Sequence, residues 1–308
     1  MLFPYPVPAD TPLTVLVVGA TGKQGGAVAK HLLARGHRVR ALTRHPASEA
    51  GAALLQMGAD LVQGDLEDPE SLRRALRGVD SAFLMATPYE AGPEAEVRQA
   101  MNFLEAFEAE AIPHLVYSSV ASADRRTGIP HFETKARIEE RIRQRSLPHT
   151  VVAPVWFMDN FATPLYGPGI AQGRLAMPLP AGRPLQMIAV EDIGSFATIV
   201  VESRDTFLGK RLDIAGDVLS PRELVQVLST LTGRAVDYEE TSLEALRSEN
   251  PDWAAMFEWF DRVGYSADIE GLRRDYPQVA WHRFADWARR VEWRALGQTR
   301  RPQAERQR

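Results

Sequence analysis

Residues 14–33, TVLVVGATGKQGGAVAKHLL, decide the fold, because they read as a strand, a tight turn and a helix. The apolar, mostly β-branched run at residues 15–18 is typical of a parallel strand buried on both faces. Gly19, Gly22 and Gly25 mark the turn, and an apolar helical face follows it. A strand that turns directly into a helix points backbone N–H groups and the positive end of the helix dipole forward. This arrangement favours an anionic ligand such as a pyrophosphate.

The spacing of these glycines, G-x-x-G-x-x-G, differs from the G-x-G-x-x-G of ordinary dinucleotide folds. It matches the short-chain dehydrogenase/reductase superfamily, especially its extended and atypical members. A structural glycine turn without a ligand is the alternative. Gly22 and Lys23 also resemble the end of a nucleotide P-loop, but Gln24 stands where Ser or Thr would bind magnesium. The flanking strand and helix therefore favour a dinucleotide site over a P-loop.

The composition limits the fold and the function. The 308 residues suffice for one large α/β domain with a smaller one attached, and 45% apolar with 25% charged residues is typical of globular proteins. A formal net charge of −4 gives no general attraction to nucleic acid, and no run approaches a membrane span. The absence of cysteine excludes disulfides, thiolate zinc sites and a cysteine nucleophile. Residues 1–12 lack the features of a secretory signal, so we expect a cytoplasmic protein.

The second predicted strand, residues 38–43, closes the first βαβ unit and is followed by Arg44. At this strand end an acid usually binds the ribose 2′-hydroxyl of NAD, whereas an Arg accommodates the 2′-phosphate of NADP. Residues 38–48 contain no acid. A surface Arg without a ligand is the alternative, but the position favours NADP(H).

Further strands are predicted at residues 59–62, 81–85 and 114–117, with helices between them. Asp65 follows the third strand, where it would contact the adenine, as in the superfamily, or cap the next turn. Ala86 and Thr87 leave the fourth strand at the level where the pyrophosphate and ribose should pass. Alternating strands and helices predict a doubly wound parallel sheet, and ligands of such sheets bind outside the carboxyl ends of the strands.

The helix predicted at residues 129–142 carries His131 and Lys135 one turn apart on one face. Short-chain reductases have a Tyr-x-x-x-Lys pair on this helix and a Ser at the preceding strand end. The Tyr protonates the carbonyl, and the Lys binds the nicotinamide ribose. Here Lys135 is kept and His131 takes the place of the Tyr, as a possible acid, a hydrogen-bonding group or part of a solvated pair. Ser118 and Ser119 are candidates for substrate contact, with bonding to the backbone as the alternative.

The chain from residue 15 to about 291 resembles the NmrA-like family of atypical short-chain dehydrogenases/reductases. The agreement lies in five blocks: GATGKQGG at 19–26, TR at 43–44, GDL at 64–66, PHFETK at 130–135 and PVWFMDNF at 154–161. The resemblance implies an NADP(H) site. It places the contacts on Gly19, Thr21, Gly22, Lys23, Gln24, Arg44, Asp65, Leu66, Ala86, Thr87, Lys135, Phe157 and Asn160, to which the glycine turn adds Gly25.

We expect a Rossmann-type domain at 13–155, to which 188–215 returns, and a smaller, mainly helical domain from 156–187 and 216–293 on the substrate side. Proline and glycine at 164–184 predict a long irregular binding loop or lid. Two groups of aromatic residues predict amphipathic helices of a packed core, or alternatively a partner surface or pocket wall: Trp253, Phe257 and Phe260, and Trp281, Phe284 and Trp287. Ser220 should cap another helix. Residues 1–12 and the basic segment 294–308 are expected to be tails.

These features predict an NADPH-dependent reductase of quinones or other small carbonyl compounds. The alternative is a non-catalytic NADPH/NADP redox sensor that regulates a partner protein, because the family includes both. The missing Tyr favours the sensor, or a substrate that needs no strong acid. A DNA-binding repressor is disfavoured, since no basic face or recognisable motif is present. We expect no metal, nucleic-acid or membrane partner, and an oligomer is possible.

Overall fold

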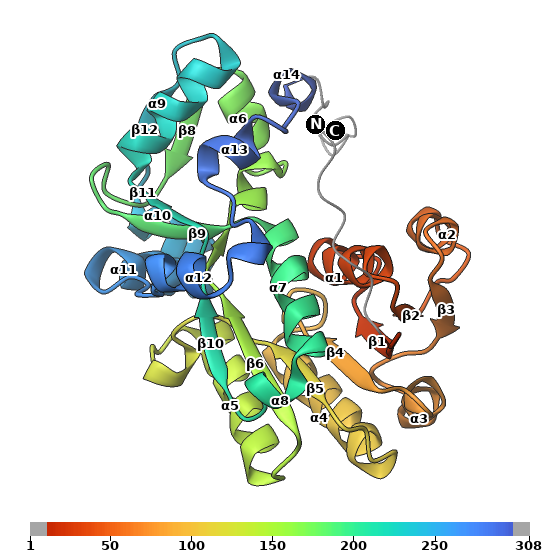
Figure 1. The fold of residues 1–308 in the computed structure, drawn as a ribbon. Helices are drawn as coiled ribbons and strands as arrows, with labels where there is room; N and C mark the ends of the chain where they lie inside the picture. Colours follow the sequence, from red (N-terminus) through yellow and green to blue (C-terminus); the bar gives the residue numbers. More distant parts are fainter. Residues whose placement is uncertain (1–10, 298–308) are drawn as a thin grey trace, which may run out of the picture. The chain divides into compact units, whose positions relative to one another are not determined.

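The computed structural model describes residues 11–297, which divide into two compact units (Figure 1). Of the described residues, the first unit contains 11–155, Val190–Ala215 and Ser266–Ala280. The second contains Trp156–Ala189, Gly216–Tyr265 and 281–297. Most of the two predicted tails lies outside the described residues. Within residues 11–297, none of the helices has the length and apolar character needed to cross a membrane.

A seven-stranded sheet forms the centre of the first unit. Its strands, in spatial order, are β10 (Arg211–Ile214), β6 (His149–Pro154), β5 (Leu115–Ser118), β4 (Ser81–Met85), β1 (Thr14–Val18), β2 (Arg38–Thr43) and β3 (Asp60–Gln63). All neighbouring strands are parallel, and Val17 of β1 lies opposite Ala41 of β2 and Phe83 of β4. The strand order reverses at β1, so the crevice for a ligand lies at the end of β1. The structure confirms the predicted doubly wound sheet, with strand ends shifted by about one residue at β3 and β5.

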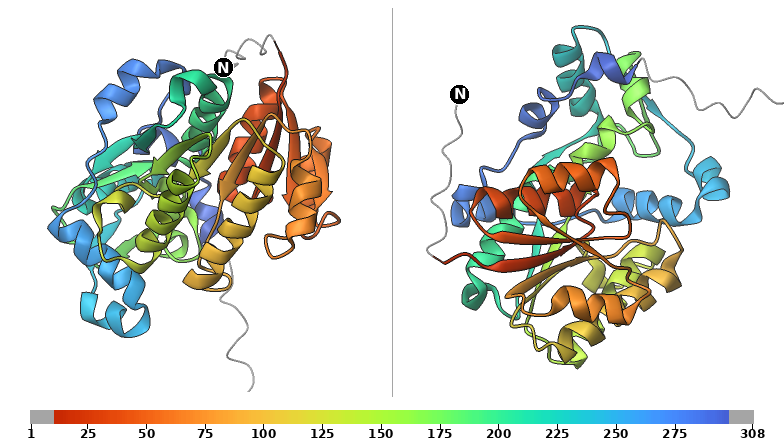
Figure 2. Two further views of the ribbon diagram at one scale, coloured as in Figure 1. Left: turned by 90° about the horizontal axis from the view of Figure 1, so that it is seen from below. Right: turned by 90° about the vertical axis from the view of Figure 1, so that its right-hand side faces the viewer.

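Helices cover both faces of this sheet. They are α1 (Lys23–Ala34), α2 (Glu49–Gln56), α3 (Pro69–Leu76), α4 (Pro93–Ala109), α5 (Pro130–Gln144), α7 (Val190–Glu202), α8 (Arg204–Phe207) and α12 (Ile269–Asp275), with the short turns η1 (Ala123–Arg125) and η3 (Pro277–Val279). The right-hand view of Figure 2 shows α1 on one side of the strands and α3 and α4 on the other. Sequence patterning predicts α1, α3, α4, α5 and α7 of this set but not α2, α8 and α12.

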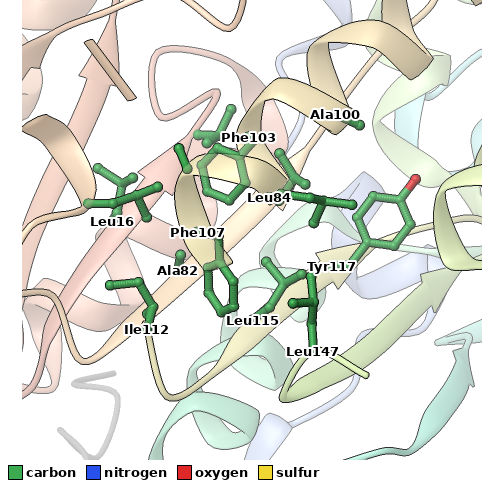
Figure 3. Packing of buried hydrophobic residues seen from close by; sticks show 14 of the residues in the cluster. Leu16, Ala82, Leu84, Ala100, Phe103, Phe107, Ile112, Leu115, Tyr117 and Leu147 are labelled. Atoms are coloured by element: carbon green, nitrogen blue, oxygen red, sulfur yellow. The ribbon is translucent and has the colours of Figure 1, made fainter. Parts of the chain in front are cut away.

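One apolar cluster joins the sheet to α3, α4 and α5. Leu84 of β4 and Leu115 of β5 pack there with Phe103 and Phe107 of α4, all fully or almost fully buried (Figure 3). Alternate strand residues enter this cluster because successive side chains of a strand point to opposite faces. The core therefore fixes α4 and α5 beside the carboxyl ends of β4 and β5.

The second unit contains helices, as predicted, and two small sheets that the sequence analysis did not predict. The sheets are β11-β9-β7 (Asp217–Leu219, Leu185–Ile188, Trp156–Phe157) and β12-β8 (Asp237–Glu240, Arg174–Met177). Its helical segments are η2 (Met158–Ala162), α6 (Gly167–Ala171), α9 (Pro221–Thr232), α10 (Leu243–Glu249), α11 (Pro251–Arg262), α13 (Phe284–Ala288) and α14 (Trp293–Leu296).

Two predictions in the second unit need correction. The stretch 164–184 is not one irregular loop, because α6 and β8 lie within it. Trp281 precedes α13, so the second aromatic group does not share one helix. In contrast, Phe257 and Phe260 do lie on α11, where they are buried and pack against Trp156 at ring-centroid distances of 5.7 and 6.1 Å. Ser220 caps α9 through a capping box, as predicted.

Candidate functional site

The glycine turn lies between β1 and α1 and depends on missing side chains. Gly19 has a φ of +70°, and a Cβ there would lie 2.6 Å from the sulfur of Met85. A Cβ on Gly25 would lie 2.4 Å from the carbonyl oxygen of Gly19, closer than any real side chain allows. The turn is closed by a hydrogen bond of 2.9 Å from the Gly22 N–H to the Gly19 carbonyl. Glycine is therefore required for the close approach of helix and strand.

The start of α1 carries no negative charge of its own. Gly22 is the N-cap, without a side-chain hydrogen bond, and the first turn contains no acidic residue. Backbone N–H groups at a helix start are only partly satisfied within the helix and carry the positive end of the dipole. The local field therefore suits an anion.

A pocket at the carboxyl edge of the sheet brings most of the predicted site residues together. The predicted residues that line it are Gly19, Thr21, Gly22, Lys23, Gln24, Gly25, Arg44, Asp65, Leu66, Ala86 and Thr87. They come from the ends of β1, β2, β3 and β4, which meet here because all four strands run in parallel. Four separate stretches of sequence thus converge on one pocket.

Arg44 is paired across this pocket. Its guanidinium donates to the carboxylate of Glu90, at 2.9 Å, from the loop between β4 and α4. The two side chains are 54% and 63% exposed. An exposed pair of this kind contributes about 0–1 kcal/mol and can be exchanged readily for another anion. Sequence analysis did not identify Glu90, since no local pattern links it to Arg44.

Asp65 lines the pocket and also closes a turn. Its carboxylate accepts from the Glu67 N–H at 2.9 Å. The N-cap of α3 is Asp68, whose carboxylate accepts from the backbone N–H groups of Glu70 and Ser71. Asp65 therefore has the turn-capping role that the sequence left open, and its place in the pocket keeps adenine contact as a prediction.

Lys135 lies on α5, with its side chain only 12% exposed. Its ammonium is 2.7 Å from the carboxylate of Glu96 on α4. It also donates to the carbonyl oxygen of Ala86, a residue that lines the pocket. Lys135 is thus held at the end of β4, next to the residues of the pocket.

His131 lies one turn before Lys135 on α5 and is partly buried. Its ring centroid is 6.4 Å from that of Tyr89, an exposed residue of the loop between β4 and α4. The two stand on different elements, so no sequence spacing could have paired them. The structure thus places the ring of Tyr89 near that of His131.

The two serines at the end of β5 are both buried. The hydroxyl of Ser119 donates to the carboxylate of Glu139, which also pairs with Arg211 of β10 at 3.0 Å. The hydroxyl of Ser118 has no hydrogen-bond partner within the described part of the chain. Ser119 therefore stabilises the loop after β5 through a side-chain network, a role that sequence analysis did not foresee.

Phe157 and Asn160 belong to the second unit, on β7 and η2 respectively, and both are partly exposed. Their contact with a cofactor stays a prediction.

Among residues 11–297, no group of His, Asp and Glu side chains could hold a metal ion.

The sheet order and the glycine turn define a Rossmann-type, doubly wound α/β protein. The model of the NmrA-like family matches residues 11–293. The chain therefore belongs to the NmrA-like family.

The proteins that this chain resembles in sequence or in structure include enzymes and a regulator. The (4-alkanoyl-5-oxo-2,5-dihydrofuran-3-yl)methyl phosphate reductase of Streptomyces griseus is 30% identical over 237 residues, which cover 76% of this chain and 79% of the relative. The NADPH-dependent quinone oxidoreductase of Escherichia coli, solved with NADPH, has a TM-score of 0.73 at 22% identity, over 89% of this chain and 98% of that one. NmrA, a negative transcriptional regulator solved with NADP, has a TM-score of 0.76 at 22% identity, over 92% and 96%. At such identities the structural likeness establishes the fold.

Proposed function

We propose that this chain is an NADPH-dependent reductase of quinones or related small carbonyl compounds. The observation that carries the proposal is the pocket lined by the glycine turn, Arg44 and the end of β4. Lys135 is bonded to that same strand end, at Ala86. The reductases among the named family members and structural neighbours support this activity.

The residues of the pocket fit a dinucleotide that carries a 2′-phosphate. Gly19 and Gly22 leave the backbone open to a pyrophosphate at the start of α1, where no acid opposes it. Arg44 supplies the cation for the 2′-phosphate, and residues 38–48 contain no acid that would favour NADH. Lys135 would hold the nicotinamide ribose. When bound, the cofactor supplies a hydride.

The substrate class follows from the missing Tyr. A ketone that accepts a hydride becomes a strongly basic alkoxide, so a positioned proton donor is valuable. A quinone becomes a delocalised phenolate-type anion, which can take its proton later from water. His131 and Lys135 without a Tyr therefore suit quinones better than simple ketones.

One observation favours a second function, namely that His131 stands where the acid of ordinary reductases is expected. A protein that binds NADPH without turnover would be a redox sensor that regulates a protein partner. The regulator NmrA has the same fold.

Steady-state NADPH oxidation with matched panels of quinones and ketones tests the proposal, together with direct titration of NADPH. We expect turnover with quinones to exceed turnover with ketones. Faster ketone turnover would contradict the substrate class. NADPH binding without turnover of either panel would support the sensor, and absence of NADPH binding would overturn both functions.

A further inference from the structure

Glu96 is a fully buried carboxylate on an otherwise apolar face of α4. It occupies the first position of a stripe that continues with Ala100, Phe103 and Phe107, all buried. A carboxylate in such surroundings is costly unless it is paired and hydrogen-bonded. Its presence there therefore needs a compensating set of contacts.

Both oxygens of Glu96 have partners on α5. One oxygen lies 2.7 Å from the ammonium of Lys135, and the other accepts from the hydroxyl of Thr134 at 2.6 Å. The Thr134 hydroxyl lies 3.0 Å from the carbonyl of His131 as well. Contacts through both oxygens hold the carboxylate in one orientation, so its charge is directed at Lys135.

The ammonium of Lys135 is held in turn from two directions. The ammonium donates a hydrogen bond to the carbonyl of Ala86, and it forms an ion pair with Glu96 Oε1, a buried oxygen that has no hydrogen-bond partner within residues 11–297. Ala86 directly follows the last residue of β4 and lines the pocket. Two anchors on different elements limit the freedom of a flexible side chain before any ligand arrives, which lowers the entropic cost of binding.

Tyr117 is the nearby polar group that does not share in this pair. Its ring lies in the core cluster with the hydroxyl oxygen at one edge (Figure 3). Burial, and then the charges of Glu96 and Glu139, raise the pKa of the Tyr117 phenol well above its ordinary value. Tyr117 therefore stays neutral, and Lys135 is the cation that balances Glu96.

We propose that Glu96 is a positioning residue, which holds the Lys135 ammonium at the end of β4 in the place where it meets the nicotinamide ribose of NADPH. The inference rests on the proposed cofactor site. A purely structural contact between α4 and α5 would affect binding of the whole cofactor. The positioning role affects only the binding of the nicotinamide ribose end.

Glu96→Gln tests the inference, since the amide keeps the size of the side chain and removes its charge. We expect this variant to bind NADPH about tenfold more weakly, the size of one hydrogen bond to a charged group. Binding of adenosine 2′,5′-bisphosphate, which lacks the nicotinamide ribose, should be unchanged. A variant that had merely lost its fold would bind both molecules poorly, so the fragment separates positioning from structural damage.

A double-mutant cycle with Lys135→Met gives the second readout. If Glu96 acts through Lys135, the double variant should bind NADPH no more weakly than Lys135→Met alone. Thr134→Val is the matched control, because it removes the other partner of Glu96 but leaves the lysine in place. It should lower the melting temperature and leave the NADPH dissociation constant within about twofold of wild type.

The outcomes distinguish this inference from the proposed function. If Lys135→Met weakens NADPH and Glu96→Gln does not, the positioning role is overturned and the cofactor site stands. Equal weakening by Thr134→Val and Glu96→Gln would also overturn it, in favour of helix packing. If Lys135→Met leaves NADPH binding at the wild-type level, the placement of Lys135 in the proposed function is itself wrong.

Discussion

At the scale of single residues, the proposed site departs from the Tyr-x-x-x-Lys pair that the resemblance to short-chain reductases led us to expect. Lys135 is kept, but the position one turn earlier on α5 is His131. Imidazole can donate a proton near neutral pH, yet its placement beside Tyr89 also suits a simple hydrogen-bonding or packing role. We therefore expect Lys135 and His131 to contribute unequally to NADPH binding and turnover.

Replacing each of them by Ala tests this difference. Lys135→Ala should weaken NADPH binding or turnover by about tenfold or more, because a charged hydrogen bond to the ribose is lost whatever the chemistry. His131→Ala should have a smaller effect, since it matters only if the imidazole docks or protonates the substrate. Titrations and steady-state rates on both variants provide the measurement. A Lys135→Ala variant that matches wild type would contradict the assignment.

His114, the residue directly before β5, links stability to pH. Its Nε2 lies 2.9 Å from the Thr150 hydroxyl, which itself donates to the Phe207 carbonyl, so Nε2 is the protonated ring nitrogen. Its buried Nδ1 has no partner within residues 11–297. Protonation would place an N–H there without an acceptor, and burial lowers the pKa of His114 to about 4.

Because the folded pKa lies below the ordinary value of 6.5, only the unfolded chain binds this proton between pH 6.5 and about 4. Acidification through that range should lower the free energy of unfolding by about 3 kcal/mol because of this residue. Urea unfolding of wild type and His114→Gln at several pH values should show a flatter dependence in the variant. Parallel curves in the two proteins would exclude this role for His114.

The helices and strands show which parts of the fold can be predicted from local sequence patterns and which cannot. The strand-turn-helix at residues 14–33 was predictable because β-branched runs, glycine spacing and helical periodicity are local signals. The small sheets of the second unit were not, since β8 and β12 pair residues such as Leu175 and Tyr238 that lie far apart in the chain. Their pairing depends on tertiary context that no local window contains.

The candidate site shows the same limit. The residues at strand ends were predictable, because parallel topology brings all carboxyl ends to one edge. Glu96 was not identified, although an acid at the head of the stripe Ala100, Phe103 and Phe107 was a signal in the sequence. Helical periodicity shows that such an acid is buried, but its partner on another helix comes from packing alone.

Gly25 should be the most sensitive position of the turn. A methyl group there would collide with the Gly19 carbonyl at 2.4 Å, so helix and strand would have to separate. Gly25→Ala should lose about 1–3 kcal/mol of stability and weaken cofactor binding. Gly182→Ala is the control, because a Cβ at Gly182 meets no atom within 4 Å. Denaturant unfolding of both variants measures the difference, and equal stabilities would refute the steric argument.

For the whole molecule, the reductase and the sensor share one requirement, which is selective binding of a cofactor with a 2′-phosphate. The pocket is lined by residues from Val18 to Gln99, all in the first unit. Arg44 is its candidate for phosphate recognition, and its exposed partner Glu90 can be displaced at little cost. The account of function therefore depends on this side chain more than on the identity of the substrate.

Calorimetric titration of NADPH and NADH into wild type, Arg44→Ala and Arg38→Ala is the most direct test. Arg38 is the control, because it is exposed at the opposite end of the same strand. Wild type and Arg38→Ala should prefer NADPH, and Arg44→Ala should lose about one to two decades of NADPH affinity with little change for NADH. If the ratio of the two affinities is the same in Arg44→Ala and wild type, Arg44 does not bind the 2′-phosphate and the proposed site is wrong.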